Sequence, residues 1–164
     1  MIYFRTFVVV MSVLLGAVAA AAEGTNVAFG AIKADPTLPV EVTADNLDVD
    51  QSDGSAEFTG NVLIVQGEMR LSAKRVLVIY NQTQSGIQRL EATGEVVLVN
   101  GPDAAEANRA DYTIDSGVIV MSGNVLLTQG ANALTSDKMT VHLTNGTARM
   151  AGRVKTILNT DGNN

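Results

Sequence analysis

Apolar and polar residues alternate along most of the chain from Val40 to Leu158. A period of two places successive side chains on opposite faces of a β-strand. The alternating stretches are rich in Val, Ile, Leu and Thr, and they lack the i, i+3, i+4, i+7 stripe of an amphipathic helix. The pattern predicts an all-β protein.

The stretches are separated by dipeptides that end in glycine: Asp53-Gly54, Gln66-Gly67, Ser85-Gly86, Asn100-Gly101, Ser116-Gly117, Gln129-Gly130 and Asn145-Gly146. Glycine adopts the positive φ that tight hairpin turns need, and Asn or Asp before it favours the same turns. Seven turns in series separate eight strands. The sequence therefore predicts an antiparallel meander.

Two short sequence boxes also recur. The first box begins at Ala44, Ala73, Ala107 and Ser136, and the second begins at Gly60, Gly94, Gly123 and Gly152. The two kinds of box alternate at steps of 13 or 16 residues, apart from one step of 21. This spacing predicts about four repeats of about 29 residues each.

The parity of positions along the strands separates an apolar inner face from a mostly polar outer face. On the inner face we expect Val42, Leu47, Val49, Phe58, Val62, Ile64, Val76, Val78, Tyr80, Leu98, Tyr112, Ile114, Val125, Leu127, Met139, Val141 and Leu143. Six apolar residues fall on the opposite face and predict an outer apolar patch: Leu63, Val65, Leu77, Ile79, Val97 and Val99.

The segment before the strands has the layout of a secretory signal peptide. A single positive charge at Arg5 precedes an uncharged apolar run that ends in small residues at Ala22. We expect residues 1–22 to be this signal, residues 23–37 to be flexible, residues 38–158 to be the folded domain and residues 159–164 to be a polar tail. An uncleaved membrane anchor is the alternative for the first segment, although the run is short for one.

Composition excludes several classes of function. The net charge is −6, which disfavours nucleic-acid binding because phosphate neutralisation needs a basic surface. The chain has no cysteine, so disulfides and thiol catalysis are excluded.

Candidate catalytic and metal-binding residues are sparse. His142 is the only histidine, and it falls on the polar face of a strand with no nucleophile motif nearby. The acidic run Asp45, Asp48, Asp50 and Asp53 lacks the spacing of an EF-hand and is better explained as a solvated strand face. We therefore expect neither an enzyme nor a metal or cofactor site.

The apolar face allows two interpretations. It could be an ordinary packed core, or it could line a cavity for flexible acyl chains. Few large aromatic side chains are available to fill the interior, which favours the cavity.

The quoted motifs resemble one known family. FTGNVLIVQGEMRLSAKRVLVIY at 58–80, ANRADY at 107–112 and MSGNVLLTQG at 121–130 are similar to the LptA family of periplasmic lipopolysaccharide-transport bridge proteins, with its OstA-like domain. The resemblance covers roughly residues 38–158. It implies a twisted β-jellyroll, open at both ends, whose interior groove holds the acyl chains of lipid A.

The resemblance also implies partners and a location. Members join end to end by pairing edge strands, with an inner-membrane LptC-like protein at the N-terminal edge and an outer-membrane LptD-like translocon at the C-terminal edge. Head-to-tail homo-oligomers, a periplasmic location and cleavage near Ala22 are expected on the same grounds.

The meander itself predicts where the exposed edges lie. We expect residues 40–50 and 147–158 to be unpaired edges available to partners. The expected docking residues are Val40, Val42, Val154, Thr156 and Leu158. Two other functions stay open: a β scaffold that assembles through its edges without carrying lipid, and a membrane-tethered LptC-like component of the same pathway.

Overall fold

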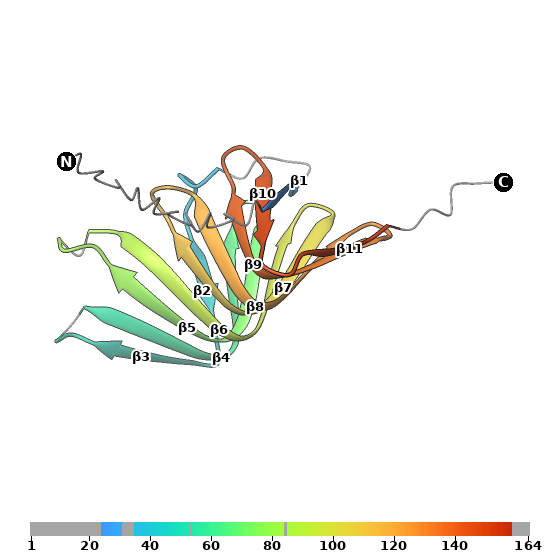
Figure 1. Ribbon diagram of the computed structural model, residues 1–164. Coiled ribbons are helices and arrows are strands. Elements are labelled where there is room, and N and C mark those ends of the chain that lie inside the picture. The colour runs from blue at the N-terminus through green and yellow to red at the C-terminus, as the bar shows by residue number, and fades with distance from the viewer. Residues whose placement is uncertain (1–23, 31–34, 53, 84, 159–164) are drawn as a thin grey trace, which may run out of the picture.

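The computed structural model describes residues 24–30, 35–52, 54–83 and 85–158. These residues form eleven β-strands in one folded sheet (Figure 1). The strands are β1 (Thr25–Ala28), β2 (Glu41–Thr43), β3 (Asn46–Asp50), β4 (Ser55–Gln66), β5 (Met69–Tyr80), β6 (Ile87–Asn100), β7 (Asp103–Thr113), β8 (Val118–Gln129), β9 (Asn132–His142), β10 (Thr147–Ala151) and β11 (Lys155–Ile157).

The predicted antiparallel meander is confirmed. Consecutive strands from β4 to β10 pair with one another, and every pairing in the sheet is antiparallel. A hairpin lies at each of the seven predicted turns. The prediction of eight strands is wrong, because the first and last of the eight each break into two, as β2–β3 and β10–β11, and β1 was not predicted.

The N-terminal segment differs from the expectation. Residues 25–28 form β1, which pairs with β10, and the side chain of Phe29 is fully buried. These described residues lie within the segment 23–37, for which the sequence predicts flexibility. The prediction that 147–158 is an unpaired edge is wrong for β10, because β1 covers it. The predicted signal peptide and tail lie outside the described residues.

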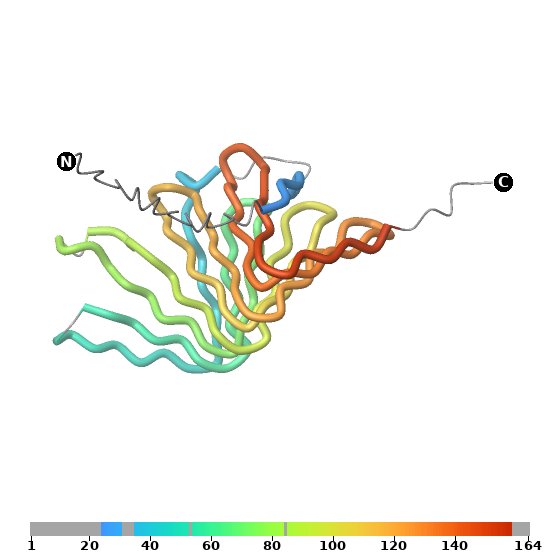
Figure 2. Tube along the Cα trace, in the orientation of Figure 1, coloured from blue at the N-terminus to red at the C-terminus, as the bar shows by residue number. Residues whose placement is uncertain are grey.

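Each long strand bends in its middle, so that the sheet folds into a V (Figures 1 and 2). The second sequence box lies at this corner. Gly60, Gly94, Gly123 and Gly152 have φ near +80°, and the residue after each also has positive φ. The pairing register shifts at the corners of the long strands, which is typical of β-bulges.

The first sequence box packs against the second at the same corner. A Cβ at Gly60 would lie 2.5 Å from Asp45 Oδ2, and one at Gly123 would lie 2.8 Å from Asn108 Nδ2. The residue after the glycine also contacts the first box: Asn61, which has positive φ, donates from Nδ2 to Asp45 Oδ2 at 2.8 Å. The two boxes therefore recur together because they build one corner between them.

We call the two sides of the V the β3 arm and the β2 arm. The β3 arm contains β3, β10, β1 and the adjoining halves of β4–β9; the β2 arm contains β2, β11 and the other halves. The apolar faces of both arms point inward and form one buried cluster. Hydrophobic burial between the arms is therefore what holds the V closed.

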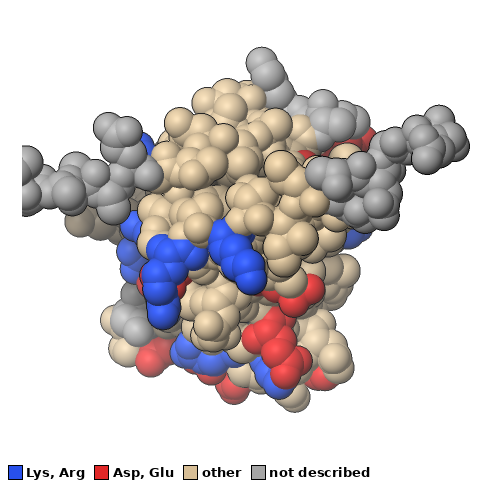
Figure 3. Space-filling view, turned by 45° about the vertical axis from the view of Figure 1, so that its right-hand side comes forward, with Lys and Arg blue, Asp and Glu red and all other residues tan. Residues whose placement is uncertain are grey.

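Ion pairs cross the outer face of the β3 arm. Arg75 on β5 donates to both carboxylate oxygens of Glu57 on β4, at 2.8 and 2.6 Å, and its guanidinium lowers the pKa of Glu57. Arg109 on β7 pairs with Asp111 and with Glu91 on β6. Charged side chains gather in the lower half of the face drawn in Figure 3, while the upper half is largely uncharged.

The predicted outer apolar patch is divided between the two arms. Leu77 and Ile79 lie on the outer face of the β3 arm, since they face Glu91 and Arg89 across β5–β6. The other four residues lie on the outer face of the β2 arm. Leu63 and Val97 are the cross-strand neighbours of Ser72, and Val65 and Val99 are those of Arg70. All six side chains are half-buried, so one continuous outer patch does not form.

The corner geometry predicts how two glycine substitutions differ. Gly130→Ala strains a backbone with φ +57° but meets open space, and it should cost about 1 kcal/mol of unfolding free energy. Gly123→Ala adds a clash with Asn108 and should cost about 1–3 kcal/mol more. Urea unfolding of the two variants measures the difference. Equal losses would contradict the account of the corner.

Candidate functional site

The space between the arms is the candidate site, and most predicted inner residues lie in it. Buried side chains are Val62, Ile64, Val76, Val78, Leu98, Tyr112, Val125, Leu127, Met139, Val141 and Leu143. Val42, Phe58 and Ile114 are half-buried and pack against this cluster. The middle of the interior is thus filled by side chains.

The interior is open at the end formed by β3, β4 and β5. Three predicted inner residues are exposed there: Leu47 by 53%, Val49 by 63% and Tyr80 by 37%. Leu47 faces Phe58 and Val49 faces Ala56 across the β3–β4 ladder, so both belong to the inner face. Together with the nearby turn they line a groove of about 530 Å³. The groove also has polar residues in its lining, Asp50, Gln51 and Ser55, while Ala56 and Phe58 connect its apolar part to the buried cluster.

A buried polar contact joins the two arms behind this opening. Tyr112 on the β3 arm donates its hydroxyl hydrogen bond to Gln66 Oε1 on the β2 arm at 2.5 Å. Burial raises the pKa of Tyr112 to about 12, so its hydroxyl remains a donor at neutral pH. Tyr112, expected to line the groove, is 2% exposed and part of this bridge.

The N-terminal segment crosses between the arms at two places. Gln66 Nε2 donates to the carbonyl oxygens of Pro36 and Leu38, at 2.9 and 2.8 Å. Gly30 N donates to Asp103 Oδ2 at 2.7 Å, and Gln129 Nε2 donates to the carbonyl oxygen of Ala28 at 2.7 Å. The segment is held by side chains at the tips of the β2 arm.

Sequence reasoning missed these polar contacts. Gln66 and Gln129 directly precede the glycines of predicted turns and are assigned to turns from the sequence, whereas Asp103 has no predicted role. Gln66 is nonetheless 2% exposed and Asp103 8% exposed, and both face inward in the register of the β2 arm. The sequence signal for such a contact is a polar residue at a strand position whose neighbours two residues away face inward.

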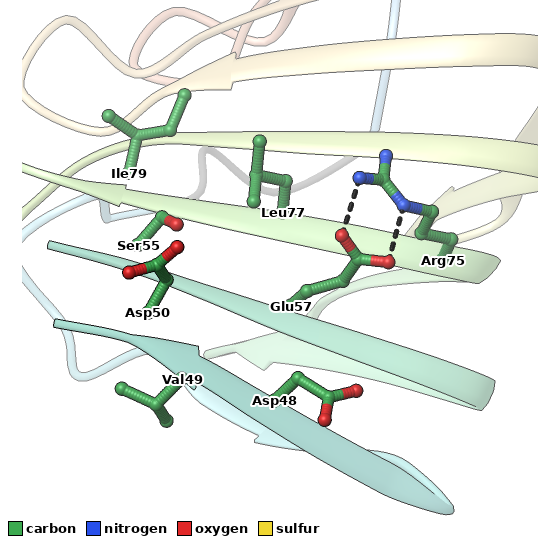
Figure 4. Close-up of a pocket in the computed structure, with 8 residues that line it drawn as sticks. All are labelled: Asp48, Val49, Asp50, Ser55, Glu57, Arg75, Leu77 and Ile79. Atoms are coloured by element: carbon green, nitrogen blue, oxygen red, sulfur yellow. Dashed lines mark hydrogen bonds and ion pairs between the residues drawn. The ribbon is translucent and has the colours of Figure 1, made fainter. Parts of the chain in front are cut away.

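A second hollow, of about 700 Å³, lies on the outer face of the β3 arm (Figure 4). Leu77 and Ile79 line one side, and the Arg75–Glu57 ion pair lies at one end. Asp48, Asp50 and Glu57 place three carboxylates around it. This acidic surface suits acyl chains poorly compared with the inner groove.

The predicted docking residues fall at both ends of the V. Val42 lies in β2 and Thr156 lies in β11, and among the described strands each of these two elements pairs on one side only. Val154 and Leu158 flank β11 and are exposed, whereas Val40 precedes β2 and packs against the core. Edges that could accept a further strand are therefore present at each end.

Other kinds of site are missing from the part of the chain that the structure describes. Within it, His, Asp and Glu side chains form no group of three that could hold a metal ion. The same residues include no helix long and apolar enough to span a membrane.

Sequence comparison gives relatives of known and unknown function. An uncharacterized protein of Rhizobium meliloti is 28% identical over 84% of this chain and 80% of its own length. The lipopolysaccharide export system protein LptA of Escherichia coli K12 is 26% identical over 67% of this chain and 63% of its own length. LptA of Haemophilus influenzae is 30% identical over 60% and 62%. The match thus spans less than two thirds of these two LptA proteins.

The fold is also that of a solved relative. LptH, the LptA homologous periplasmic component of the lipopolysaccharide transport device of Pseudomonas aeruginosa, aligns with a TM-score of 0.68 and 17% identity. The alignment covers 77% of this chain and 99% of LptH. The family described as "LptA/(LptD N-terminal domain) LPS transport protein" matches residues 41–147. The chain therefore belongs to the LptA/LptD N-terminal family of lipopolysaccharide transport proteins.

Proposed function

We propose that this protein shields the acyl chains of lipopolysaccharide between its two arms while the lipid crosses from the inner to the outer membrane. The observation that carries the proposal is the open groove at β3–β5, where Leu47, Val49 and Tyr80 expose apolar surface on the inner face. As a member of a transport family the chain is not an enzyme, as its sequence predicts.

The energetics favour such a carrier. Exposing an acyl chain to water costs about 0.8 kcal/mol for each CH₂ group. The exposed side chains at the open end are available for first contact, whereas the buried side chains deeper between the arms contact lipid only if they repack. The first lipid contacts should therefore be made by Leu47, Val49, Phe58 and Tyr80.

The relatives support a proposal for the cellular setting. We propose a periplasmic protein, exported by residues 1–22 and cleaved near Ala22, because LptH is a periplasmic component. We also propose that the domain is a twisted open jellyroll built from about four repeats. The four corner glycines, each with φ near +80°, support the proposal of four repeats.

The two ends of the V suit end-to-end assembly. β2 carries Glu41 and β11 carries Lys155, both on the β2 arm and at opposite ends of the sheet, while the neighbouring Arg153 is paired with Asp137. Opposite charges at the two ends favour head-to-tail contact between copies. We propose that an LptC-like protein docks at the β2–β3 end and an LptD-like translocon at the β11 end.

Two alternatives make different predictions. A scaffold that assembles through its edges without carrying lipid would bind no lipopolysaccharide at Val49. A membrane-tethered LptC-like component would keep residues 1–22, so the N-terminal sequence of the exported protein discriminates it from a cleaved form.

In-cell photo-crosslinking tests the groove. A photoreactive residue at Val49 should form an adduct with lipopolysaccharide, because this side chain lies on the inner face of β3. The matched control is Asp48, the neighbouring position on the outer face. Adducts of equal strength at both positions, or none at Val49 in folded protein, would rule out the inner groove as the lipid site.

Charge reversal tests the ends. Lys155→Glu should weaken self-association at low salt by up to about fivefold, and Glu41→Lys in the second copy should restore it, because β11 and β2 end the same arm. Lys138→Glu makes the same change of net charge on β9, at a position paired with a strand on each side, and serves as the control. Sedimentation equilibrium gives the association constants. Equal weakening by both glutamates would argue for a net-charge effect instead of a contact between ends.

A further inference from the structure

The half of the interior beneath β8–β10 is closed by residues 24–30 of the chain. β1 pairs along β10, from Thr25 opposite Met150 to Ala28 opposite Thr147. Phe29 continues this contact, since its backbone N donates to the carbonyl oxygen of Gly146 at 2.9 Å. We call residues 24–30 the N-terminal strap.

The strap reaches from one arm to the other. Gly146 belongs to the tip of the β3 arm, whereas Asp103 and Gln129, which hold Gly30 and Ala28, belong to the tips of the β2 arm. Gly30 lies so close to Asn100 that a Cβ would approach its amide nitrogen to 2.2 Å. The strap therefore closes the mouth of the V at this end.

The strap also fills space inside the V. Phe29 is fully buried and belongs to the same apolar cluster as the inner faces of the arms. At the open β3–β5 end, by contrast, the inner face is exposed and lined by Leu47, Val49 and Tyr80. The two ends thus differ in whether a protein segment occupies the space between the arms.

The side chains beneath the strap are ones that repack easily. Met121, Met139 and Met150 lie next to one another on β8, β9 and β10, and all three are fully buried. Methionine is unbranched and has three rotatable side-chain bonds, so it adapts to differently shaped neighbours. Met150 lies opposite Thr25, so this row lies beneath the first residues of the strap and could pack against the strap or against an acyl chain.

We propose that the strap is a removable closure, and that acyl chains pass beneath β8–β10 only after β1 leaves β10 and withdraws Phe29. The inference rests on the proposed function, because it describes how the same groove is extended. β1 is a strand of four residues at the edge of the sheet, with one neighbouring strand among those described. Short edge strands separate at lower cost than central strands.

A disulfide can lock the strap in place. Asn26 and Arg149 are exposed and directly opposite on β1 and β10. Because Phe29 and Gly146 are hydrogen-bonded, the alternation of an antiparallel ladder makes 26 and 149 a non-hydrogen-bonded pair, with Cα atoms about 4.5 Å apart. That spacing suits a disulfide, and the chain has no cysteine of its own to interfere. The variant is Asn26→Cys with Arg149→Cys.

The measurement is a methyl NMR titration of the double variant with purified lipopolysaccharide, oxidised and reduced. Leu47 and Val49 methyl signals report the open end, and Met139 and Met150 methyl signals report the interior beneath the strap. We expect all four signals to shift in the reduced protein. In the oxidised protein we expect the Leu47 and Val49 shifts to remain and the methionine shifts to be lost.

The same titration separates two kinds of failure. Methionine shifts of equal size in the oxidised and reduced protein would overturn the strap proposal while leaving the proposed function intact. No shift at Leu47 or Val49 in either state would contradict the proposed function, and the strap proposal would fall with it. Since both states are the same polypeptide, amide spectra recorded beforehand confirm that each is folded.

Discussion

The fold depends on the corner at which every long strand changes direction. Two successive residues with positive φ bend the strand, and the first must be glycine because a side chain from the neighbouring strand occupies the position of its Cβ. At the last corner the second residue is Arg153, whose guanidinium binds Asp137 and lowers the pKa of that carboxyl. Without these corners the strands would form an open sheet with an apolar face in water.

Folding the sheet at one line has consequences for the interior. The arms meet in the middle of the molecule, where Tyr112 and Gln66 bridge them, and diverge at the β3–β5 end. A groove that is filled in the middle and open at one end can admit an acyl chain first at the open end. Passage further along requires the core to rearrange, which the buried methionines make easier than a core of β-branched residues would.

Much of this architecture could be predicted from the sequence, because strand parity and turn glycines act locally. The meander, the seven hairpins and the inner position of Val76 or Leu127 follow from period two. Three features do not follow from local patterns: the break of the outermost strands, the exposure of Leu47 and Val49, and the β1–β10 pairing. Each depends on which segments meet in space: β3 has one neighbour among the described strands, and β1 pairs with a strand more than a hundred residues away.

In the candidate site, too, local sequence predicts some features and distant contacts decide the others. Parity identified the apolar residues, but it could not separate those that pack the core from those that face an open groove. The sequence assigns Gln66 to a turn and predicts no role for Asp103, because their partners, Pro36, Leu38 and Gly30, lie far away in sequence. Only the folded chain brings these amide and carboxylate groups to the backbone that they bind.

The central claim is that the exposed inner face at β3–β5 binds acyl chains. Native mass spectrometry of the mature protein, purified from the cell envelope without detergent, tests it most directly. The account predicts a population carrying the mass of lipopolysaccharide, lost in Leu47→Asp and retained in the neighbouring outer-face variant Asp48→Asn. Equal occupancy of the two variants, or no lipid on the unaltered protein, would contradict it.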